Sequence, residues 1–500
     1  MAHRSPRHKA TLAITSIALL VATALGGSAI AAPVVEPPST PVPISTPDGL
    51  LMSYVVNVRD TSPGRTKLAE LAVRAAGGTV VQSWGQIGVI VAHSSKATFR
   101  ADVVRLAEGH AVESVGATRT VAVSEGTPSL DGSPRKGASP AKTKKQVGLA
   151  EESQEATPVL DPRETEQWDM KQIKADQAHA ITDGSRDVVV GVLDSGIEST
   201  HPDLAPNFDA ADSVSCVDAG HPDLNPASYQ PTTSDHGTHV SGTIAAARNG
   251  IGIVGVAPNV RIASVKVVND DGFIYPEYAV CGFMWAGLKG MEVTNNSYYV
   301  DPFMFYCEDQ PDQAAAKEAV RRAVLWSETK GVVSAAAAGN AHYDLANKTT
   351  DGTSPDDQPP SGFVNRTINN GCQDIPTELS GVVTVASTTQ ALAKSSFSNF
   401  GNGVIDVAAP GSRILSTVTN KGYGLKSGTS MASPHVAGVL ALLKSTHPTA
   451  TPAQLVQLLR AQADDLACPT TPIAGQPCTG TTADNGFFGE GIADALDAVG

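Results

Sequence analysis

Two hydrophobic patterns follow each other along the 500-residue chain, and the longer one begins at about residue 167. From there on, short runs that are apolar on both faces alternate with longer amphipathic runs, as buried strands alternate with helices. The predicted strands are DVVVGVLD (187–194), RIASVKVV (261–268), MEVTNNSYY (291–299), GVVSAAAAGN (331–340), GVVTVAS (381–387) and GVIDVAAPG (403–411). The predicted helices are HVSGTIAAA (239–247), PEYAVCGFMWAGLK (276–289), AAAKEAVRRAVLWSETK (314–330), MASPHVAGVLALLKS (431–445) and TPAQLVQLLRAQA (451–463). This alternation predicts an α/β fold with a doubly wound, mostly parallel sheet and helices on both faces.

A shorter pattern precedes this one, between residues 50 and 125. Its predicted elements, in order, are the strand SYVVNV (53–58), the helix KLAELAVRAA (67–76), two strands within GGTVVQSWGQIGVIVAHS (77–94), the helix KATFRADVVRLAEG (96–109) and the strand RTVAVS (119–124). The order β-α-β-β-α-β predicts a small ferredoxin-like α+β domain that is large enough to have its own core.

The segments that lack such a period complete the predicted organisation. Residues 1–31 have the parts of a signal peptide: a basic start (MAHRSPRHK), an apolar run (TLAITSIALLVATALGG) and a small-x-small cleavage site. A single membrane anchor is the alternative, but the cleavage site favours export, and the short basic start and compact signal are typical of bacterial-type export. Residues 32–49 are a Pro-rich linker that we expect to be extended and mobile. Residues 126–166 are a second, flexible linker open to proteolysis, and the α/β domain occupies residues 167–500.

Charge and hydropathy argue against nucleic acid and the membrane as partners. The formal net charge is −14, and this charge would repel a polyanion such as nucleic acid. After the first thirty or so residues, no run is long and apolar enough to span a bilayer. We therefore expect an exported, secreted protein that is a monomer without stable membrane association.

The six cysteines are even in number, which favours disulfides in an exported chain, although six cysteines allow fifteen pairings. Cys468 and Cys478 flank a short loop rich in Pro, Gly and Thr, so they are the most local pair. The guessed pairs for the other four are Cys216–Cys281 and Cys307–Cys372. No Cys-x-x-Cys pair with a histidine partner is present, so we expect no zinc cluster.

Polar residues follow apolar segments at three places in the large domain. In a parallel sheet of this kind, functional residues are expected at the carboxyl ends of the strands. Asp194 closes the strand VVVGVLD, although an aspartate there can also be a simple turn former. His236 stands at a predicted helix entry in DHGTHVSG, where Gly237 leaves room for close backbone approach. The third place is GTSMASPHVAG (428–438), which contains Ser430 and His435. Five helical residues turn through about 500°, so His435 is expected to be a packing residue and not the base of Ser430.

In the order Asp…His…Ser, these motifs resemble those of the subtilisin-type serine proteases (subtilases, peptidase family S8), from about residue 167 to the end. The resemblance implies that Ser430 is the nucleophile, His236 the general base and Asp194 the group that orients the imidazole. The segment SAAAAGN matches the family's AAAGN, which implies that Asn340 donates to the oxyanion together with the N–H of Ser430. The residues implied to bind an extended substrate are Ser297, Tyr298, Tyr299, Ala338 and Gly339.

The chain departs from the family pattern beside the substrate strand. Tyr298 and Tyr299 stand where the family usually has an apolar residue followed by glycine, so we expect reshaped subsites unless Tyr299 packs elsewhere. Residues 301–312 and 342–378 are expected to be loop insertions around the cleft. The small domain at 50–125 resembles a subtilase prosegment, which implies an intramolecular chaperone and inhibitor that is removed by cleavage in the linker.

The implied function is a secreted serine endopeptidase that cleaves polypeptide substrates through an acyl-enzyme and is made with a removable prosegment. The implied chemistry requires no cofactor and no metal. Because calcium is common in the family, we expect a structural calcium ion but assign it no ligands. A processing protease that trims one precursor is an alternative, and so is an inactive subtilase-fold binding module, which the four intact catalytic positions disfavour. An esterase of the α/β-hydrolase type is excluded, because its acid and histidine would follow a serine within G-x-S-x-G.

Overall fold

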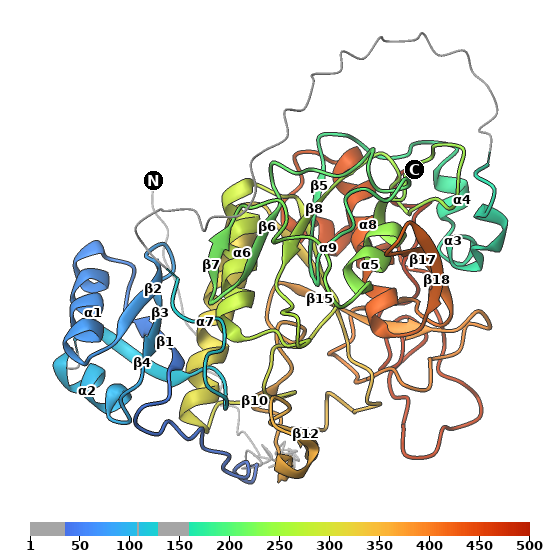
Figure 1. The fold of residues 1–500 in the computed structure, drawn as a ribbon. Coiled ribbons are helices and arrows are strands. Elements are labelled where there is room, and N and C mark those ends of the chain that lie inside the picture. The colour runs from blue at the N-terminus through green and yellow to red at the C-terminus, as the bar shows by residue number, and fades with distance from the viewer. Residues whose placement is uncertain (1–35, 108–109, 129–159) are drawn as a thin grey trace, which may run out of the picture. The chain divides into compact units, whose positions relative to one another are not determined.

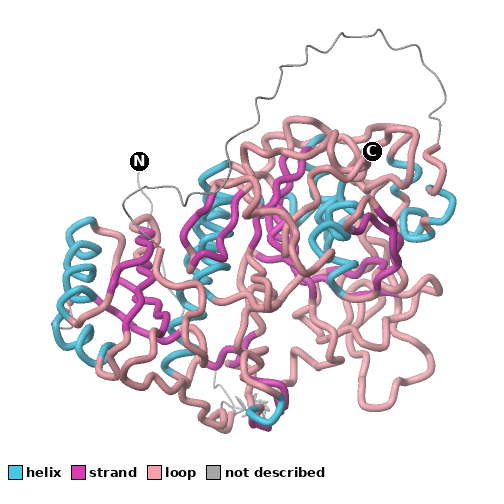
Figure 2. The backbone as a smooth tube through the Cα atoms, viewed as in Figure 1, coloured by secondary structure: helices cyan, strands magenta, loops and turns pink. Residues whose placement is uncertain are grey.

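The structure is a computed structural model that describes residues 36–107, 110–128 and 160–500 (Figure 1). The predicted signal peptide (1–31) and most of the predicted linker 126–166 lie outside the described residues. The described part contains a large sheet with helices around it and a smaller sheet with two helices (Figures 1 and 2). No helix in this part of the chain is long and apolar enough to cross a membrane.

An eight-stranded sheet forms the centre of the large domain, in the order β16-β15-β11-β9-β5-β8-β6-β7. All neighbouring strands pair in parallel except β6 and β7. In chain order the strands are β5 (Val189–Asp194), β6 (Val214–Asp218), β7 (His221–Asp223), β8 (Arg261–Lys266), β9 (Val293–Asn296), β11 (Val333–Ala337), β15 (Val382–Thr388) and β16 (Val407–Pro410). The predicted doubly wound, mostly parallel sheet is confirmed.

Helices cover both faces of this sheet. The main helices are α5 (His236–Ala245), α6 (Pro276–Lys289), α7 (Pro311–Thr329), α8 (Thr429–Thr446) and α9 (Pro452–Ala461). Helices α6 and α7 pack on each other, whereas α8 packs on both α5 and α9. Alternate residues of β5 explain this division: Val189 and Leu193 join the core under α6 and α7, and Val190 and Val192 join the core under α5 and α8. A strand that is buried on both faces therefore separates two cores.

The N-terminal module, residues 50–125, has the predicted ferredoxin-like topology. Its antiparallel sheet has the order β2-β3-β1-β4, with one helix between β1 and β2 and another between β3 and β4. The elements are β1 (Met52–Val58), α1 (Pro63–Ala75), β2 (Thr79–Trp84), β3 (Val89–Ser94), α2 (Phe99–Leu106) and β4 (Val112–Ala117). The prediction of a last strand at 119–124 is wrong, because β4 lies earlier and Arg119 is drawn into contact with the large domain.

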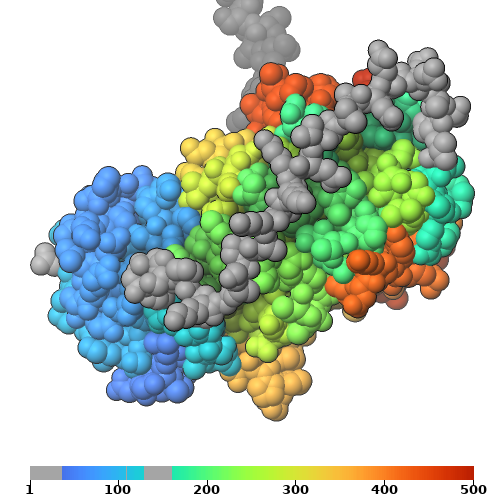
Figure 3. All heavy atoms as spheres, turned by 45° about the horizontal axis from the view of Figure 1, so that its top comes forward, coloured from blue at the N-terminus to red at the C-terminus, as the bar shows by residue number. Residues whose placement is uncertain are grey.

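The N-terminal module packs against α6 and α7 through one face of its sheet. In Figure 3 its blue surface meets the green and yellow surface of the large domain. The Asn57 side chain donates to the carbonyl of Ala315 (2.9 Å), and the N–H of Ala117 donates to the Asp312 carboxylate (2.8 Å). Gly116 lies so close to α7 that an added Cβ would be 2.7 Å from the Ala315 Cβ. The two parts therefore share a tightly packed interface.

Smaller elements surround the sheet. They are the helices α3 (Trp168–Gln172) and α4 (Ala175–Ala178), the 3₁₀ turns Glu164–Glu166 and Pro360–Gly362, the hairpin of β17 (Ile414–Val418) and β18 (Gly422–Lys426), and the strand pairs β10 (Tyr306–Cys307) with β14 (Cys372–Gln373) and β12 (Thr350–Ser354) with β13 (Val364–Thr367). Strands β10 and β14 belong to the two predicted insertions, 301–312 and 342–378, and join them to each other.

All three guessed disulfides form: Cys216–Cys281, Cys307–Cys372 and Cys468–Cys478. Cys307–Cys372 links the two inserted segments beside their strand pair. Part of the predicted Pro-rich linker is also held there. Ser39 donates through its N–H and its hydroxyl to the Asp309 carboxylate (2.7 and 2.6 Å), and the N–H of Thr40 donates to the carbonyl of Thr367 (2.9 Å).

Candidate active site

The candidate acid and base come from the end of β5 and the start of α5. Asp194 is buried, and half-buried His236 presents its Nδ1 at 2.9 Å from both carboxyl oxygens of Asp194. Asp194 Oδ1 also accepts the N–H of Ser195 (2.7 Å), which holds the carboxyl group in place. Because a carboxylate only accepts, Nδ1 carries the proton and Nε2 is left as an acceptor.

Asp194 also sets the charge preference of the imidazole. Burial lowers the pKa of His236, but the negative charge of Asp194 and its hydrogen bond outweigh burial, so this pKa is raised above its usual value. The pair therefore favours an imidazole that takes up a proton and holds it as a cation.

Gly237 is required by the close approach of α5 to the turn after β5. A Cβ at this position would lie 2.4 Å from the carbonyl oxygen of Gly196 and 3.2 Å from the Asp194 Cβ. The N–H of Gly237 also donates to Ser195 Oγ (3.0 Å). The reason given for this glycine from the sequence is confirmed, because any side chain here would push His236 away from Asp194.

Ser430 is the second residue of α8 and contacts the end of β9. Its Oγ donates to the carbonyl of Ser297 (3.3 Å), and Ser297 Oγ donates to the carbonyl of Ser430 (3.0 Å). In the parallel register Leu193 pairs with Asn296, so Asp194 and Ser297 are the next residues on neighbouring strands. Ser430 thus lies at the same edge of the sheet as Asp194 and His236. Within the described part of the chain, no hydrogen bond joins Ser430 to His236.

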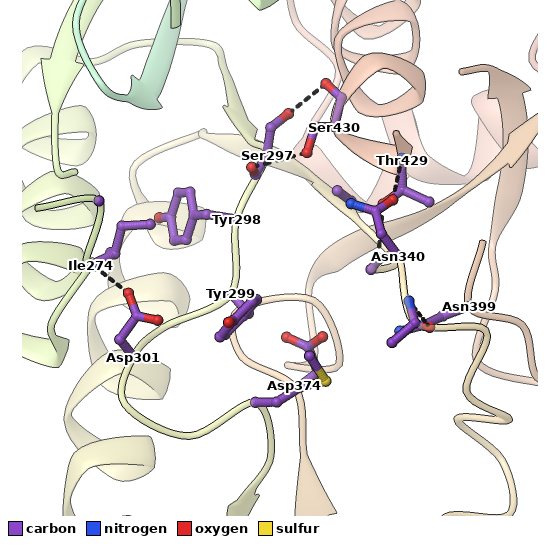
Figure 4. A pocket seen from close by; sticks show the side chains of 15 residues that line it. Ile274, Ser297, Tyr298, Tyr299, Asp301, Asn340, Asp374, Asn399, Thr429 and Ser430 are labelled. Carbon is purple, nitrogen blue, oxygen red and sulfur yellow. Dashed lines mark hydrogen bonds between the residues drawn. The ribbon is translucent and has the colours of Figure 1, made fainter. Parts of the chain in front are cut away.

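Asn340 follows β11, the other neighbour of β9. Its Oδ1 accepts both the N–H (2.8 Å) and the hydroxyl (2.9 Å) of Thr429. A backbone N–H can only donate, so this contact determines which side of the amide carries the oxygen. The Nδ2 group is therefore turned away from Thr429 and toward Ser297 and Ser430 (Figure 4). Asn340 is exposed, and its amide is available to a ligand.

A cavity of about 300 Å³ opens beside Ser430 (Figure 4). Of the residues predicted to bind substrate, Ser297, Tyr298, Tyr299 and Gly339 line this cavity. Ala338 is fully buried instead, with its carbonyl accepting from the Asn399 side chain (2.7 Å), and its neighbour Ala337 lines the wall.

Both tyrosine rings belong to the cavity wall, so Tyr299 does not pack elsewhere. The Tyr299 hydroxyl donates to the Asp356 carboxylate (2.6 Å), and the Tyr298 hydroxyl donates to Asn296 Oδ1 (3.1 Å). Because each ring is anchored at its far end, the two side chains form a fixed wall. The expectation of reshaped subsites fits this arrangement.

Several further cavity residues were not recognised in the sequence, among them Asp301, Met304, Asp374 and Asn399. Asp301 and Met304 come from the first inserted segment and Asp374 from the second. The sequence signal for Asp374 is indirect: it stands two residues after Cys372, whose disulfide joins the two segments. No local motif reveals that this loop returns to the site.

The other histidines near the motifs have structural roles. His435 is fully buried; its Nδ1 donates to the carbonyl of Met431 (2.8 Å), and its Nε2 contacts the carboxylate of buried Asp169 (3.0 Å). His239 is also fully buried, and its Nε2 lies 3.1 Å from the carbonyl of Ile414. His435 is therefore a packing residue on the inner side of α8, as predicted.

A metal site is not formed by the described side chains. Within residues 36–107, 110–128 and 160–500, no group of three or more His, Cys, Asp or Glu side chains is arranged to hold a metal ion. The expectation of a structural calcium ion stays a prediction without ligands.

A carboxylate bonded to an imidazole, a serine at a helix start and an amide donor at one sheet edge are the parts of a serine hydrolase site. Comparison with known proteins gives the family. The model of the Subtilase family matches residues 185–491, and the chain belongs to this family of serine proteases. It is 36% identical to a subtilisin of Bacillus pumilus over 296 residues, which are 59% of this chain and 90% of that protein. It is 35% identical to subtilisin E of Bacillus subtilis (strain 168), also over 59% of this chain but 65% of that protein.

Solved structures support the same fold. The epidermin leader peptide processing serine protease of Staphylococcus aureus matches with a TM-score of 0.63 and 21% identity, over 90% of this chain and 98% of that one. Fervidolysin of Fervidobacterium pennivorans, a keratinolytic enzyme related to subtilisin, matches with a TM-score of 0.62 and 23% identity, over 90% and 61%. At these identities the likeness concerns the fold.

Proposed function

We propose that this chain is the precursor of an exported serine endopeptidase, with Asp194, His236 and Ser430 as its catalytic triad. The observation that carries the proposal is the meeting of these side chains at one sheet edge. Asp194 is bonded to His236, and Ser430 is bonded to Ser297, the residue beside Asp194 on the neighbouring strand.

In this mechanism Ser430 Oγ attacks the carbonyl carbon of a peptide bond while its proton passes to Nε2 of His236. In the structure Ser430 Oγ bonds to the carbonyl of Ser297, and we infer that rotation about its Cα–Cβ bond redirects it toward the imidazole. Catalytic hydrogen bonds are often long or poorly aligned until substrate binds. Asp194 stabilises the imidazolium, which then protonates the leaving amine. A water molecule repeats the sequence and hydrolyses the acyl-enzyme.

Two donors are available to the negative oxygen of the tetrahedral intermediate. One is Nδ2 of Asn340, whose orientation is held by Thr429. The other is the N–H of Ser430, which is in the first turn of α8 and so lacks an intrahelical acceptor. Losing one such donor lowers kcat by about 10²–10³-fold, a magnitude that comes from subtilisin itself.

We further propose that the N-terminal module is a prosegment and that the first 31 residues direct export. The interface with α6 and α7 supports a role in assisting folding, because the module offers those helices a complementary surface that shares their core. The described residues that line the cavity beside Ser430 all lie between Gly272 and Ser430, so the module docks beside the cavity and not within it. The basic and apolar halves of residues 1–31 and the three disulfides support export.

The proposal is tested by treating the matured protein with a fluorophosphonate and mapping the adduct by peptide mass spectrometry. We expect a single adduct on Ser430 and hydrolysis of a casein or peptide substrate that the reagent abolishes. Ser430→Ala should remove both labelling and hydrolysis. An adduct on another residue, or hydrolysis that persists in Ser430→Ala, would overturn the assignment.

Ser427→Ala is a matched control, because Ser427 is an exposed serine three residues before the nucleophile and its Oγ only accepts the N–H of Arg413 (2.8 Å). It should keep both labelling and hydrolysis. The Ser430→Ala chain should also accumulate with the N-terminal module attached if maturation is autocatalytic. If purified Ser430→Ala matures by itself, self-processing is wrong.

A further inference from the structure

The cavity beside Ser430 contains a buried carboxyl group that lacks a full set of partners. Asp374 is 2% exposed, and its Oδ1 has no hydrogen-bond partner among the described residues. Its carboxyl group is turned into the cavity, between Tyr299 and Asn340 (Figure 4). A Cβ on Gly339 would lie 3.6 Å from Asp374 Oδ2, so this oxygen adjoins the wall that leads to Asn340.

The cation that acts on the pKa of Asp374, Lys348, is already engaged elsewhere. Lys348 Nζ donates to Glu378 Oε1 (2.6 Å) and to the carbonyl of Leu345 (2.7 Å), and Glu378 Oε2 accepts the backbone N–H of Asp374 (2.7 Å). Lys348 and Glu378 neutralise each other, which leaves one excess negative charge when Asp374 is ionised. Burial and then Glu378 raise the pKa of Asp374 well above its usual value, against an opposing effect of Lys348. A buried carboxyl group in this condition is stabilised by any cation that enters the cavity.

The second acid of the cavity, Asp301, is in contrast well partnered. It accepts the N–H of Ile274 and interacts with Asp356, whose carboxylate also accepts the Tyr299 hydroxyl. No lysine, arginine or histidine is among the described residues that line the cavity. The electrostatic character of the cavity is therefore acidic, and Asp374 is its unsatisfied group.

The remaining walls suit an aliphatic stem. Ile274, Met304 and Ala337 line the cavity together with the ring of Tyr298. A side chain with several methylene groups and a terminal cation can pack its stem against these walls and place its charge at Asp374. Such a side chain matches the cavity in both shape and charge.

The position of the cavity identifies which substrate residue enters it. Ser430 attacks a carbonyl carbon whose oxygen is received by Asn340, and both residues line this cavity. The side chain of the residue that contributes this carbonyl, on the acyl side of the scissile bond, therefore enters the cavity. We propose that Asp374 makes this protease select arginine or lysine at the acyl-side position. This inference rests on the proposed function, because it uses Ser430 as the nucleophile.

The test uses peptides that differ only in the acyl-side residue, which is arginine in one and citrulline, its uncharged isostere, in the other. For the matured wild-type enzyme, kcat/KM should be at least about 100-fold higher for arginine, since truncating one partner of a buried charge pair has effects of this size. Asp374→Asn should reduce the ratio to below about tenfold while the citrulline peptide is still cleaved. Equal rates for the two peptides in wild type, or an unchanged ratio in Asp374→Asn, would overturn the inference.

Asp271→Asn is the matched control, because Asp271 is an exposed carboxylate on the loop that carries Gly272 and Ile274. It removes the same charge close to the cavity and should keep the arginine preference. If Asp374→Asn does not fold or mature, benzamidine and neutral benzamide are compared as inhibitors of wild type. Benzamidine should bind at least tenfold more tightly, and equal binding would overturn the inference.

The two proposals fail in different ways. If Ser430 is not the nucleophile, it is not labelled by fluorophosphonate, and neither peptide is hydrolysed through it. If only the selection by Asp374 is wrong, Ser430 is labelled and both peptides are cleaved at similar rates.

Discussion

Arg119→Ala tests what holds the N-terminal module on the large domain. The Arg119 side chain is 1% exposed and its Nη2 donates to Glu277, which is fully buried in α6, and to Glu125 (2.9 Å). The guanidinium carbon lies 3.8 Å from the centre of the Tyr275 ring. Without Arg119, the Glu277 carboxylate keeps the Ser53 hydroxyl as donor (2.8 Å) but loses its cation.

The size of the effect follows from this burial. Removing one partner of a buried ion pair costs about 3–5 kcal/mol, because the other charge is left uncompensated. The contact with the Tyr275 ring contributes roughly 1 kcal/mol more. Since about 1.4 kcal/mol corresponds to a factor of ten, the interface should open at least about 100-fold more often.

Hydrogen exchange in the full-length Ser430→Ala chain measures this opening, because that variant is expected to keep the module attached. Two of the amides that cross the interface serve as probes: the N–H of Ala117 donates to Asp312 (2.8 Å), and the N–H of Thr120 donates to Asp357 (2.7 Å). Their protection factors should fall at least about 100-fold in Arg119→Ala. Amides of β15, which lies inside the large sheet, serve as the internal reference and should not change.

Arg65→Ala is the control for removing an arginine from the same module. Arg65 pairs with Asp60, and their side chains are 44% and 48% exposed, so the change should leave the protection of Ala117 and Thr120 unaltered. Replacing Arg119 by Met and Glu277 by Leu together should recover most of the protection. The reasoning is refuted if Arg119→Ala changes protection of Ala117 and Thr120 by less than about tenfold, or if β15 loses as much.

Three further outcomes are expected for the matured enzyme. Because Asp194 raises the pKa of His236 and the base must be neutral, kcat/KM should fall as the pH drops through this raised pKa. Asp194→Asn should move this fall in kcat/KM to lower pH and should lower kcat by about 10⁴-fold. A pH profile that does not move would contradict the pairing of Asp194 with His236. Gly237→Ala should lower kcat/KM at least about 100-fold, because its Cβ would displace the helix that carries His236. The control Gly352→Ala lies in the large domain, where its Cβ would meet only Asn365 Oδ1 at 3.7 Å, and it should have wild-type activity in the same peptide assay. If the enzyme cleaves its own linker and selects arginine or lysine, sequencing should find the mature N-terminus directly after one of the five lysines and arginines in residues 126–159. A mature N-terminus after a neutral residue would count against the combination of self-processing and this selectivity.

Much of the fold was predictable because its signals are local. The strand that ends at Asp194 is apolar at every position before that residue, and such a strand is stable only inside a sheet that is covered on both faces. The glycine after His236 and the small residues around Ser430 mark close backbone approach within a few positions of each motif. The long sequence motifs therefore identified the family correctly. The pair Cys468–Cys478 followed from its position around a short loop, whereas the other two disulfides were guesses.

The incorrectly predicted strand at 119–124 in the N-terminal module shows the limit of predicting structure from a local sequence pattern. RTVAVS alternates like a strand, but Arg119 lies in this segment and pairs with Glu277, 158 residues later. The preceding segment VESVGA pairs with β1 instead. A contact with a distant charge outweighed a local pattern, and a single-sequence pattern contains no information about that contact.

By itself, the sequence determined the α/β class, the order of the elements and the candidate residues Asp194, His236, Asn340 and Ser430, because periodicity and motif spacing are written in neighbouring positions. Only the tertiary structure decided what surrounds them. It turned the amide of Asn340 toward Ser430 through Thr429, and it brought Asp374 from an inserted loop to the cavity. These positions result from chain closure over long loops and a disulfide, so the electrostatic character of the cavity exists only in the folded molecule.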